Sequence, residues 1–213
     1  MKISIPNKIN IVAEIGCNHM GKMQLAKKMI ILAKKAGADF VKFQKRDNRV
    51  LFSKKQFNEK HPVEKNSFGK TYGEHREFLE FSFNQHKELY DYCLKNKIKY
   101  SCSVWDINSA KIMKKICKDY IKVPSAVNLN FSLLKYLCIN YKKDIHVSTG
   151  MTSKKNVKKI VNFFKKYKRN NSLILYSCVS DYPVNISNVN LLDVYELKNK
   201  YKKLVKKIGF SGH

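Results

Sequence analysis

The amino-acid sequence predicts an α/β fold, namely an incomplete TIM (β/α)8-type barrel with about seven strands and six helices. Two observations support this prediction. Short runs rich in Val, Ile and Phe, which are typical of buried parallel strands, alternate strictly with longer Lys-rich segments. In the longer segments, apolar residues recur at spacings of three and four, which is the pattern of an amphipathic helix. The alternation therefore predicts a run of βα units.

The expected strands are short and apolar, and they cover residues 9–15, 40–44, 100–103, 120–123, 145–148, 173–178 and 207–210. The expected helices lie between consecutive strands and cover residues 24–36, 76–96, 108–116, 131–140, 154–167 and 190–201. An eight-stranded barrel needs one more strand, so we expect the eighth strand to be missing. A doubly wound open sheet remains the alternative, because periodicity alone does not separate the two folds.

A long polar segment, residues 45–73, interrupts the alternation after the second expected strand. It contains Pro62, Gly69 and Gly73, which favour turns. Loops of this length in compact domains are usually functional or disordered. In a barrel this segment would lie at the C-terminal rim of the strands, where active sites are found.

The composition fits a single domain, residues 1–213, because 44% of the residues are hydrophobic and can form a sizeable core. The longest apolar runs are too short for a membrane span, and the N-terminus lacks the apolar core of a signal peptide. We therefore expect a cytoplasmic enzyme with no membrane partner. The six cysteines form no CxxC pair and are expected to be buried free thiols.

The formal net charge of +27 raises the question of nucleic-acid binding. However, the lysines are spread along nearly every expected helix, and no helix-turn-helix, RRM or zinc-finger spacing is present. The sequence therefore argues against a nucleic-acid partner. A positive field would instead attract anionic small substrates.

Polar residues gather at the expected C-terminal ends of the strands, where a barrel builds its site. Lys42 and Lys122 are the most informative of them, because a lysine in a buried strand is rare unless it is paired or functional. Together with neighbouring serine hydroxyl groups, these lysines predict a cradle for a phosphate group. The alternative is that each polar residue simply begins a loop.

Several segments resemble motifs of the sialic acid synthase family, which includes the N-acetylneuraminate synthases and other nonulosonic acid synthases. They read IVAEIGCNHMG at 11–21, AGADFVKFQ at 36–44, IKVPSA at 121–126, STGM at 148–151, CVSDYP at 178–183 and GFSGH at 209–213. Their order and approximate spacing are those of the family, and the similarity spans the whole chain. The resemblance implies that phosphoenolpyruvate condenses with an acylated amino-sugar aldehyde, such as N-acetylmannosamine, to give a nine-carbon 2-keto sugar acid and phosphate.

The resemblance also implies roles for individual residues. Lys42 and Lys122 match the lysines that hold the phosphate of phosphoenolpyruvate, and the assisting hydroxyl groups match Ser103, Ser125, Ser148 and Ser211. Glu14 matches the catalytic glutamate, which can steady the cation formed at the enol ether carbon or take a proton from the attacking water. The positions that contact the sugar match Gln44, Ser180 and Tyr182.

In this family a divalent metal polarises the aldehyde oxygen as a Lewis acid. The resemblance implies manganese, with magnesium or cobalt as alternatives. His213 matches one of the two histidine ligands of that metal. Gly212 stands where the family usually has Asp, which would weaken the orientation of the metal site.

The family normally continues with an eighth strand and a small antifreeze-like C-terminal domain, which serves the partner subunit in a domain-swapped homodimer. The resemblance therefore implies that residues 1–213 form a truncated barrel without that domain, and that the full-length protein is a homodimer. Two alternatives remain open. One is another phosphoenolpyruvate-aldol synthase, and the other is an inactive or basic binding protein built on a decayed barrel.

Overall fold

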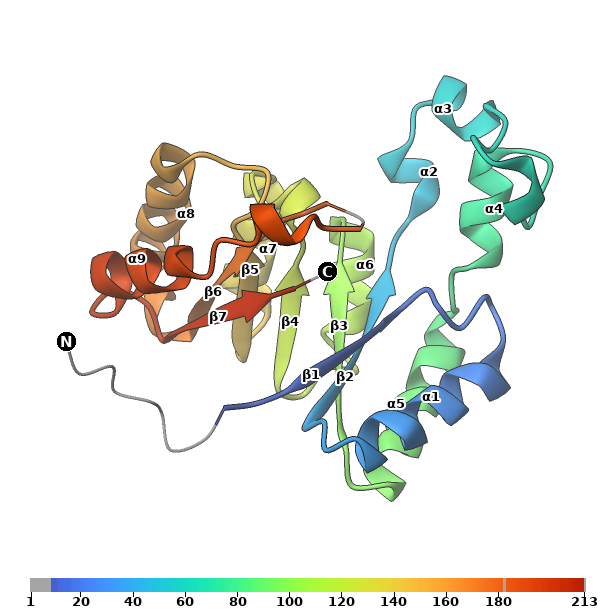
Figure 1. Cartoon of the computed structure of the whole chain (residues 1–213), viewed down its shortest axis with the longest axis horizontal. Helices are drawn as coiled ribbons and strands as arrows, with labels where there is room; N and C mark the ends of the chain where they lie inside the picture. Colours follow the sequence, from blue (N-terminus) through green and yellow to red (C-terminus); the bar gives the residue numbers. More distant parts are fainter. Residues whose placement is uncertain (1–8, 182, 213) are drawn as a thin grey trace.

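In the computed structural model of this protein, the strands form one parallel sheet that curls into part of a barrel (Figure 1). The structure describes residues 9–181 and 183–212. Within these residues the strands are β1 (Val12–Gly16), β2 (Phe40–Lys45), β3 (Lys99–Val104), β4 (Tyr120–Val123), β5 (Asp144–Ser148), β6 (Leu173–Cys178) and β7 (Lys207–Ser211). Each strand pairs in parallel with the next one along the chain. A doubly wound sheet reverses its strand order part-way, so this unbroken order rules out the open-sheet alternative.

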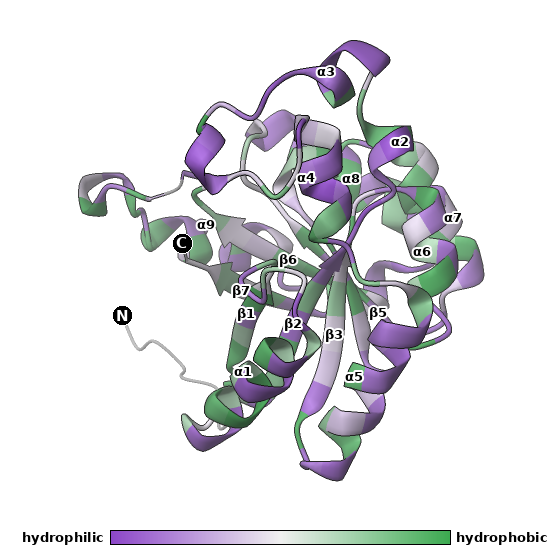
Figure 2. Ribbon diagram, turned by 90° about the vertical axis from the view of Figure 1, so that its right-hand side faces the viewer, coloured by the Kyte–Doolittle hydropathy of each residue, from purple (hydrophilic) through white to green (hydrophobic). Residues whose placement is uncertain are grey.

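A helix follows each of the first six strands and covers the outer side of the curled sheet (Figure 1). These helices are α1 (Met23–Lys35), α5 (Phe83–Lys95), α6 (Ile107–Met113), α7 (Phe131–Asn140), α8 (Lys154–Lys166) and α9 (Leu192–Tyr201). Short 3-10 turns occur at η1 (Glu64–Asn66), η2 (Ser125–Val127), η3 (Asn170–Ser172) and η4 (Ile186–Asn188). Figure 2 shows hydrophobic and hydrophilic residues alternating along α1 and α5, as the helical spacing predicts.

Helix α8 illustrates why these segments fold as amphipathic helices. The hydroxyl group of Ser153 accepts a hydrogen bond from the backbone N–H of Asn156 and so caps the first turn. Val157, Ile160 and Phe164 are buried on one side of the helix, while its lysines are mostly exposed. Burial of each such apolar side chain stabilises the fold by about 1.5–3 kcal/mol.

The two faces of the sheet differ in chemistry because successive side chains of a strand point to opposite sides. The outer face carries apolar side chains such as Val41, Ile121 and Val147, which belong to the main hydrophobic core together with the helices. The register of the strands brings the alternate positions together on the inner face, and these are largely polar: Glu14, Lys42, Ser101, Ser103, Lys122, His146 and Ser148. The core therefore lies between sheet and helices, and the inner face is left for polar chemistry.

The segment 45–73 folds into short helices beyond the C-terminal end of β2 (Figure 1). It contains α2 (Asn48–Leu51) and α3 (Lys54–Asn58), and both helices pack against α4 (Tyr72–Phe78). The hydroxyl group of Ser53 accepts a hydrogen bond from the backbone of Gln56 and caps α3. As predicted, this segment lies at the C-terminal rim of the strands.

The prediction of one continuous helix over 76–96 is wrong. Helix α4 ends at Phe78 and helix α5 begins at Phe83. Between them, the Glu80 carboxylate accepts a hydrogen bond from the backbone N–H of Arg46 at 3.0 Å. Ser82 and Gln85 then form a capping box that begins α5. The first strand is also shorter than predicted, because it begins at Val12.

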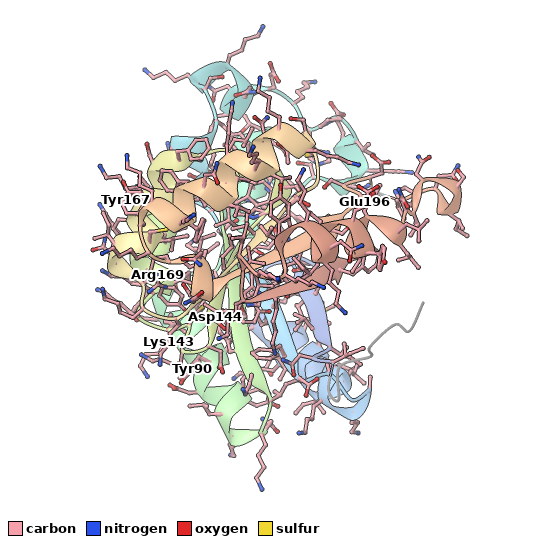
Figure 3. All side chains as sticks on the ribbon, turned by 90° about the vertical axis from the view of Figure 1, so that its left-hand side faces the viewer. Tyr90, Lys143, Asp144, Tyr167, Arg169 and Glu196 are labelled. Carbon is pink, nitrogen blue, oxygen red and sulfur yellow. The ribbon has the colours of Figure 1, made fainter. Side chains whose placement is uncertain are left out.

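The positive charge is dispersed over the molecule. Figure 3 shows nitrogen-tipped side chains projecting from many elements around the outline of that view. Some of these charges make local contacts, such as the hydrogen bond from Arg169 to the backbone oxygen of Lys143 at 2.7 Å. Dispersed charge does not build the single basic face that nucleic-acid binding uses. Within the described residues, no helix is long and apolar enough to cross a membrane.

Candidate active site

Two buried lysines converge on the inner face of the sheet. Lys42 on β2 is 5% exposed, and Lys122 on β4 is 6% exposed. The Nζ atom of Lys42 donates a hydrogen bond to Ser103 Oγ at 3.2 Å, and Ser103 lies directly opposite Lys122 in the register of β3 and β4. The Nζ atom of Lys122 donates to Ser211 Oγ on β7 at 3.1 Å. Two ammonium groups and two hydroxyl groups therefore face one region.

The electrostatics of this pair follow from burial. Burial, together with the nearby charge of Lys122, holds the pKa of Lys42 well below its usual value. Burial lowers the pKa of Lys122 to about 8. The Lys122 ammonium also lies 4.8 Å from the centre of the Tyr176 ring, a cation–π contact that offsets part of this cost. An anion bound between the two lysines would relieve their mutual repulsion.

Glu14 and Gln44 lie next to the lysine pair. The Glu14 carboxylate forms an ion pair with the Lys42 ammonium, its register partner across β1 and β2. Gly16 separates the two side chains, because a Cβ atom added there would lie 3.2 Å from Gln44 Nε2 and 3.4 Å from Glu14 Oε1. Gly16 also has a φ of +55°, which favours glycine. The end of β1 therefore leaves the carboxylate and the amide room to meet.

The remaining predicted serines meet at the end of β5. A Cβ atom on Gly150 would contact Ser180 Oγ and would lie 2.7 Å from Ser125 Oγ. The side-chain amide of buried Asn128 holds this loop by donating to the backbone oxygen atoms of Ser148 and Gly150 at 2.9 and 3.0 Å. Ser148 itself is buried on the inner face, on the strand next to β4.

The aromatic floor of the site could not be read from the motifs. The ring of His146 stacks on Tyr120 at 3.7 Å, and its Nδ1 atom lies 3.0 Å from the hydroxyl group of Tyr176. These rings lie beside Lys122 on the inner face, and burial with surrounding lysine charges holds the pKa of His146 well below its usual value. The only available signal was the period of two along β4, β5 and β6, which puts the three rings on the inward side.

The structure does not test the expected metal. Tyr182 and His213, two of the predicted site residues, lie outside the described residues. Within residues 9–181 and 183–212, no three His, Cys, Asp or Glu side chains come together in a way that could hold a metal ion.

Comparison with known proteins decides the family. The model of the NeuB family matches residues 29–213, which is most of the chain. The chain belongs to the NeuB family.

Two named relatives illustrate the range of this family. N-acetylneuraminate-9-phosphate synthase of Drosophila melanogaster is 34% identical over 207 residues, which cover 97% of this chain and 54% of the relative. N,N'-diacetyllegionaminic acid synthase of Campylobacter jejuni is 31% identical over 208 residues, covering 97% and 61%. The chain thus spans little more than half the length of these NeuB-family relatives.

The fold of the NeuB family is also known from solved structures. A crystal structure of N-acetylneuraminic acid synthetase from Leptospira borgpetersenii, in complex with citrate, superimposes with a TM-score of 0.80 at 27% identity. The match covers 100% of this chain and 70% of that one. This likeness confirms the predicted barrel-type fold.

Proposed function

We propose that this protein condenses phosphoenolpyruvate with an acylated amino-sugar aldehyde, N-acetylmannosamine or a related sugar, to a nine-carbon 2-keto sugar acid. Phosphate is released in the reaction. The observation that carries the proposal is the pair of buried lysines, Lys42 and Lys122, which face one region together with two serine hydroxyl groups. Two buried cations with hydroxyl donors suit a phosphate dianion. The names of the two NeuB-family relatives, both synthases of nonulosonic acids, support this chemistry.

Glu14 and the two lysines each have a role in the proposed reaction. The terminal carbon of phosphoenolpyruvate forms a bond to the aldehyde carbon, whose oxygen takes up a proton. Positive charge develops at the enol ether carbon, water adds there and loses a proton, and the adduct expels phosphate as the ketone forms. In this proposal Glu14 accepts the proton of the water, and Lys42 and Lys122 hold the phosphate from binding to release.

The hydroxyl groups complete the proposed phosphate and sugar contacts. Ser103 and Ser211 already accept hydrogen bonds from the two lysines and can turn their own protons towards phosphate oxygen atoms. Gln44 on β2 and Ser180, which follows β6, are proposed to contact the sugar. A divalent metal, manganese in the first instance, a homodimeric assembly and a cytoplasmic location remain parts of the proposal.

Phosphate release tests the proposal directly. The purified protein is incubated with phosphoenolpyruvate, Mn²⁺ and N-acetylmannosamine or its 6-phosphate, and the product mass is determined. Lys122→Met should lower kcat/KM for phosphoenolpyruvate by about a hundredfold or more. The matched control is Lys158→Met, an exposed lysine of α8, which should leave the rate unchanged.

Two results would count against the proposal. Absence of phosphate release with every acylated hexosamine tried would contradict the proposed reaction itself. Phosphate release at the wild-type rate by Lys122→Met would be compatible with the reaction. It would contradict the assignment of the lysine pair as the phosphate-binding group.

A further inference from the structure

Two arginines converge on one sulfur atom at the rim of the candidate site. Arg46 follows β2 and Arg76 lies on α4, while Cys17 follows β1. The distance from Arg46 Nη1 to Cys17 Sγ is 3.6 Å, and the distance from Arg76 Nη2 to the same sulfur is 3.7 Å. Because both guanidinium groups reach one atom, a single oxyanion bound beside the Cys17 sulfur could contact both.

The charge in this cluster is not balanced. Lys45 and Arg46 share one carboxylate, Glu80, with N···O distances of 3.4 and 3.7 Å. Among the described residues, Arg76 has no carboxylate within 4.0 Å, and its one hydrogen-bond partner is the Cys17 sulfur. Burial raises the pKa of Cys17, so its thiol is protonated and contributes no negative charge. Lys45 and Arg46 therefore pair with Glu80, whereas Arg76 and the carboxylate of Asp106 act on Glu80 only at longer range.

The Glu80 carboxyl group is a weaker acid than usual. Burial raises the pKa of Glu80 to about 7, against the opposing effect of Lys45 and Arg76. Its Oε1 atom is buried without a hydrogen bond, as is the Nε1 donor of nearby Trp105, whose ring stacks on the Arg46 guanidinium at 4.1 Å. The Trp105 Nε1–H is a buried donor without a partner, and together with the two guanidinium groups it offers hydrogen bonds that a bound oxyanion would accept.

The cluster is joined to the reacting groups through one side chain. The Arg46 guanidinium donates a hydrogen bond to Gln44 Oε1. Gln44 lies across Gly16 from Glu14, which in turn pairs with Lys42. The arginines therefore lie at the mouth of the proposed site, separate from the two lysines.

We infer that Arg46 and Arg76 form a second anion subsite, which binds a phosphate monoester carried by the sugar. The inference rests on the proposed function and names its substrate class, an acylated hexosamine phosphate. Condensation adds three carbons at the aldehyde end, so the sixth carbon of the hexosamine becomes the ninth carbon of the product. A 6-phosphate thus extends away from the reacting carbon, and its ester bond remains intact. Family membership does not decide this point, because the relatives include both a 9-phosphate synthase and a legionaminic acid synthase.

The single tryptophan of the chain offers a direct readout, since Trp105 stacks on Arg46. The probes are the sugar alcohol of N-acetylmannosamine and its 6-phosphate, which lack the aldehyde and do not react, and inorganic phosphate. Tryptophan fluorescence should report saturable binding of the phosphorylated alcohol, at least about tenfold tighter than either other probe. Equal affinity of the two sugar alcohols, or binding of inorganic phosphate alone, would overturn the inference.

Variants assign the binding to the arginines. Arg76→Gln should weaken binding of the phosphorylated alcohol by about tenfold or more, and Arg76→Lys should restore part of it, because charge returns without the bidentate geometry. Arg49→Gln is the matched control, because Arg49 lies on α2, which packs against α4, but its side chain is 72% exposed. Circular dichroism checks that each variant is folded. Unchanged affinity in folded Arg76→Gln would overturn the inference.

Failure of the inference and failure of the proposed function give different results. With the aldehyde substrates, the ratio of kcat/KM for N-acetylmannosamine 6-phosphate to that for N-acetylmannosamine should exceed ten and fall towards one in Arg76→Gln. Activity with the unphosphorylated sugar alone would contradict the inference of a second anion subsite but would still support the proposed function. Tight binding of the phosphorylated alcohol without phosphate release from phosphoenolpyruvate would instead contradict the proposed function.

Discussion

Lys122→Met should make the protein more stable while strongly weakening its affinity for phosphoenolpyruvate. The Lys122 side chain is 6% exposed, and burial lowers its pKa from 10.5 to about 8. A shift of this size corresponds to roughly 3 kcal/mol of unfavourable free energy for keeping the charged lysine buried at neutral pH. Methionine has a similar length and no charge, so the substitution removes that cost.

Two contacts of the lysine reduce the net gain. Lys122 donates a hydrogen bond to Ser211 and lies over the ring of Tyr176, and each contact contributes about 1 kcal/mol. The expected increase in the free energy of unfolding is therefore about 1–3 kcal/mol at pH 7. For a chain of this length, such a gain raises Tm by roughly 2–12 °C.

The pH dependence identifies the cause. Below about pH 8 the lysine is charged in both the folded and the unfolded protein, so the full cost is present. Between about pH 8 and 10.5 the folded protein releases the proton that the unfolded chain still holds, so wild-type stability rises relative to the variant. The advantage of Lys122→Met should therefore shrink over this range.

Urea unfolding at pH 7, 8.5 and 9.5 measures both effects, and Lys158→Met serves as the exposed control. Phosphoenolpyruvate should raise the Tm of the wild type and of the control but not that of Lys122→Met. A destabilised Lys122→Met whose difference from the wild type does not change with pH would refute the reasoning.

Three other outcomes are expected. Gly150→Ala should lower kcat/KM by about tenfold or more, because the added methyl group would collide with the Ser180 hydroxyl group; wild-type kinetics would contradict this. Phe164→Ala should cost about 3–5 kcal/mol in urea unfolding, since Phe164 is 0% exposed, whereas Phe78→Ala, at a 49% exposed position, should cost far less. Stability should fall on acidification below about pH 6.5, because burial lowers the pKa of His86 to about 3 and the unfolded chain binds the proton first; an unchanged free energy of unfolding between pH 7 and pH 5 would argue against this.

The sequence predicted the strands well because their signal is local. The run from Leu173 to Cys178 and the run from Tyr120 to Val123 match β6 and β4 residue for residue. Each run is mostly apolar, and Pro124 directly follows the second, so the local pattern indicates where the strand lies. The same local signal placed Lys42 and Lys122 inside strands, which was sufficient to predict that both face one site.

Other features depended on contacts between distant residues. The break between α4 and α5 is formed by Glu80 and Arg46, which lie far apart in the chain, although the Ser82–Gln85 capping box could have indicated it. His86 has polar neighbours in the sequence, yet it is fully buried, with its Nδ1 atom 2.6 Å from the Tyr100 hydroxyl group. The convergence of Arg46 and Arg76 on Cys17 has no sequence signature at all.

The placement of the core between sheet and helices has a consequence for how this scaffold can change. Side chains on the inner face, such as Ser103 and Ser148, contribute little to the apolar packing that resists unfolding. Substitutions there can alter the polar chemistry of the site without weakening the fold, and removal of a buried charge can even stabilise it. The side chains of the inner face can therefore differ between relatives while the fold stays the same.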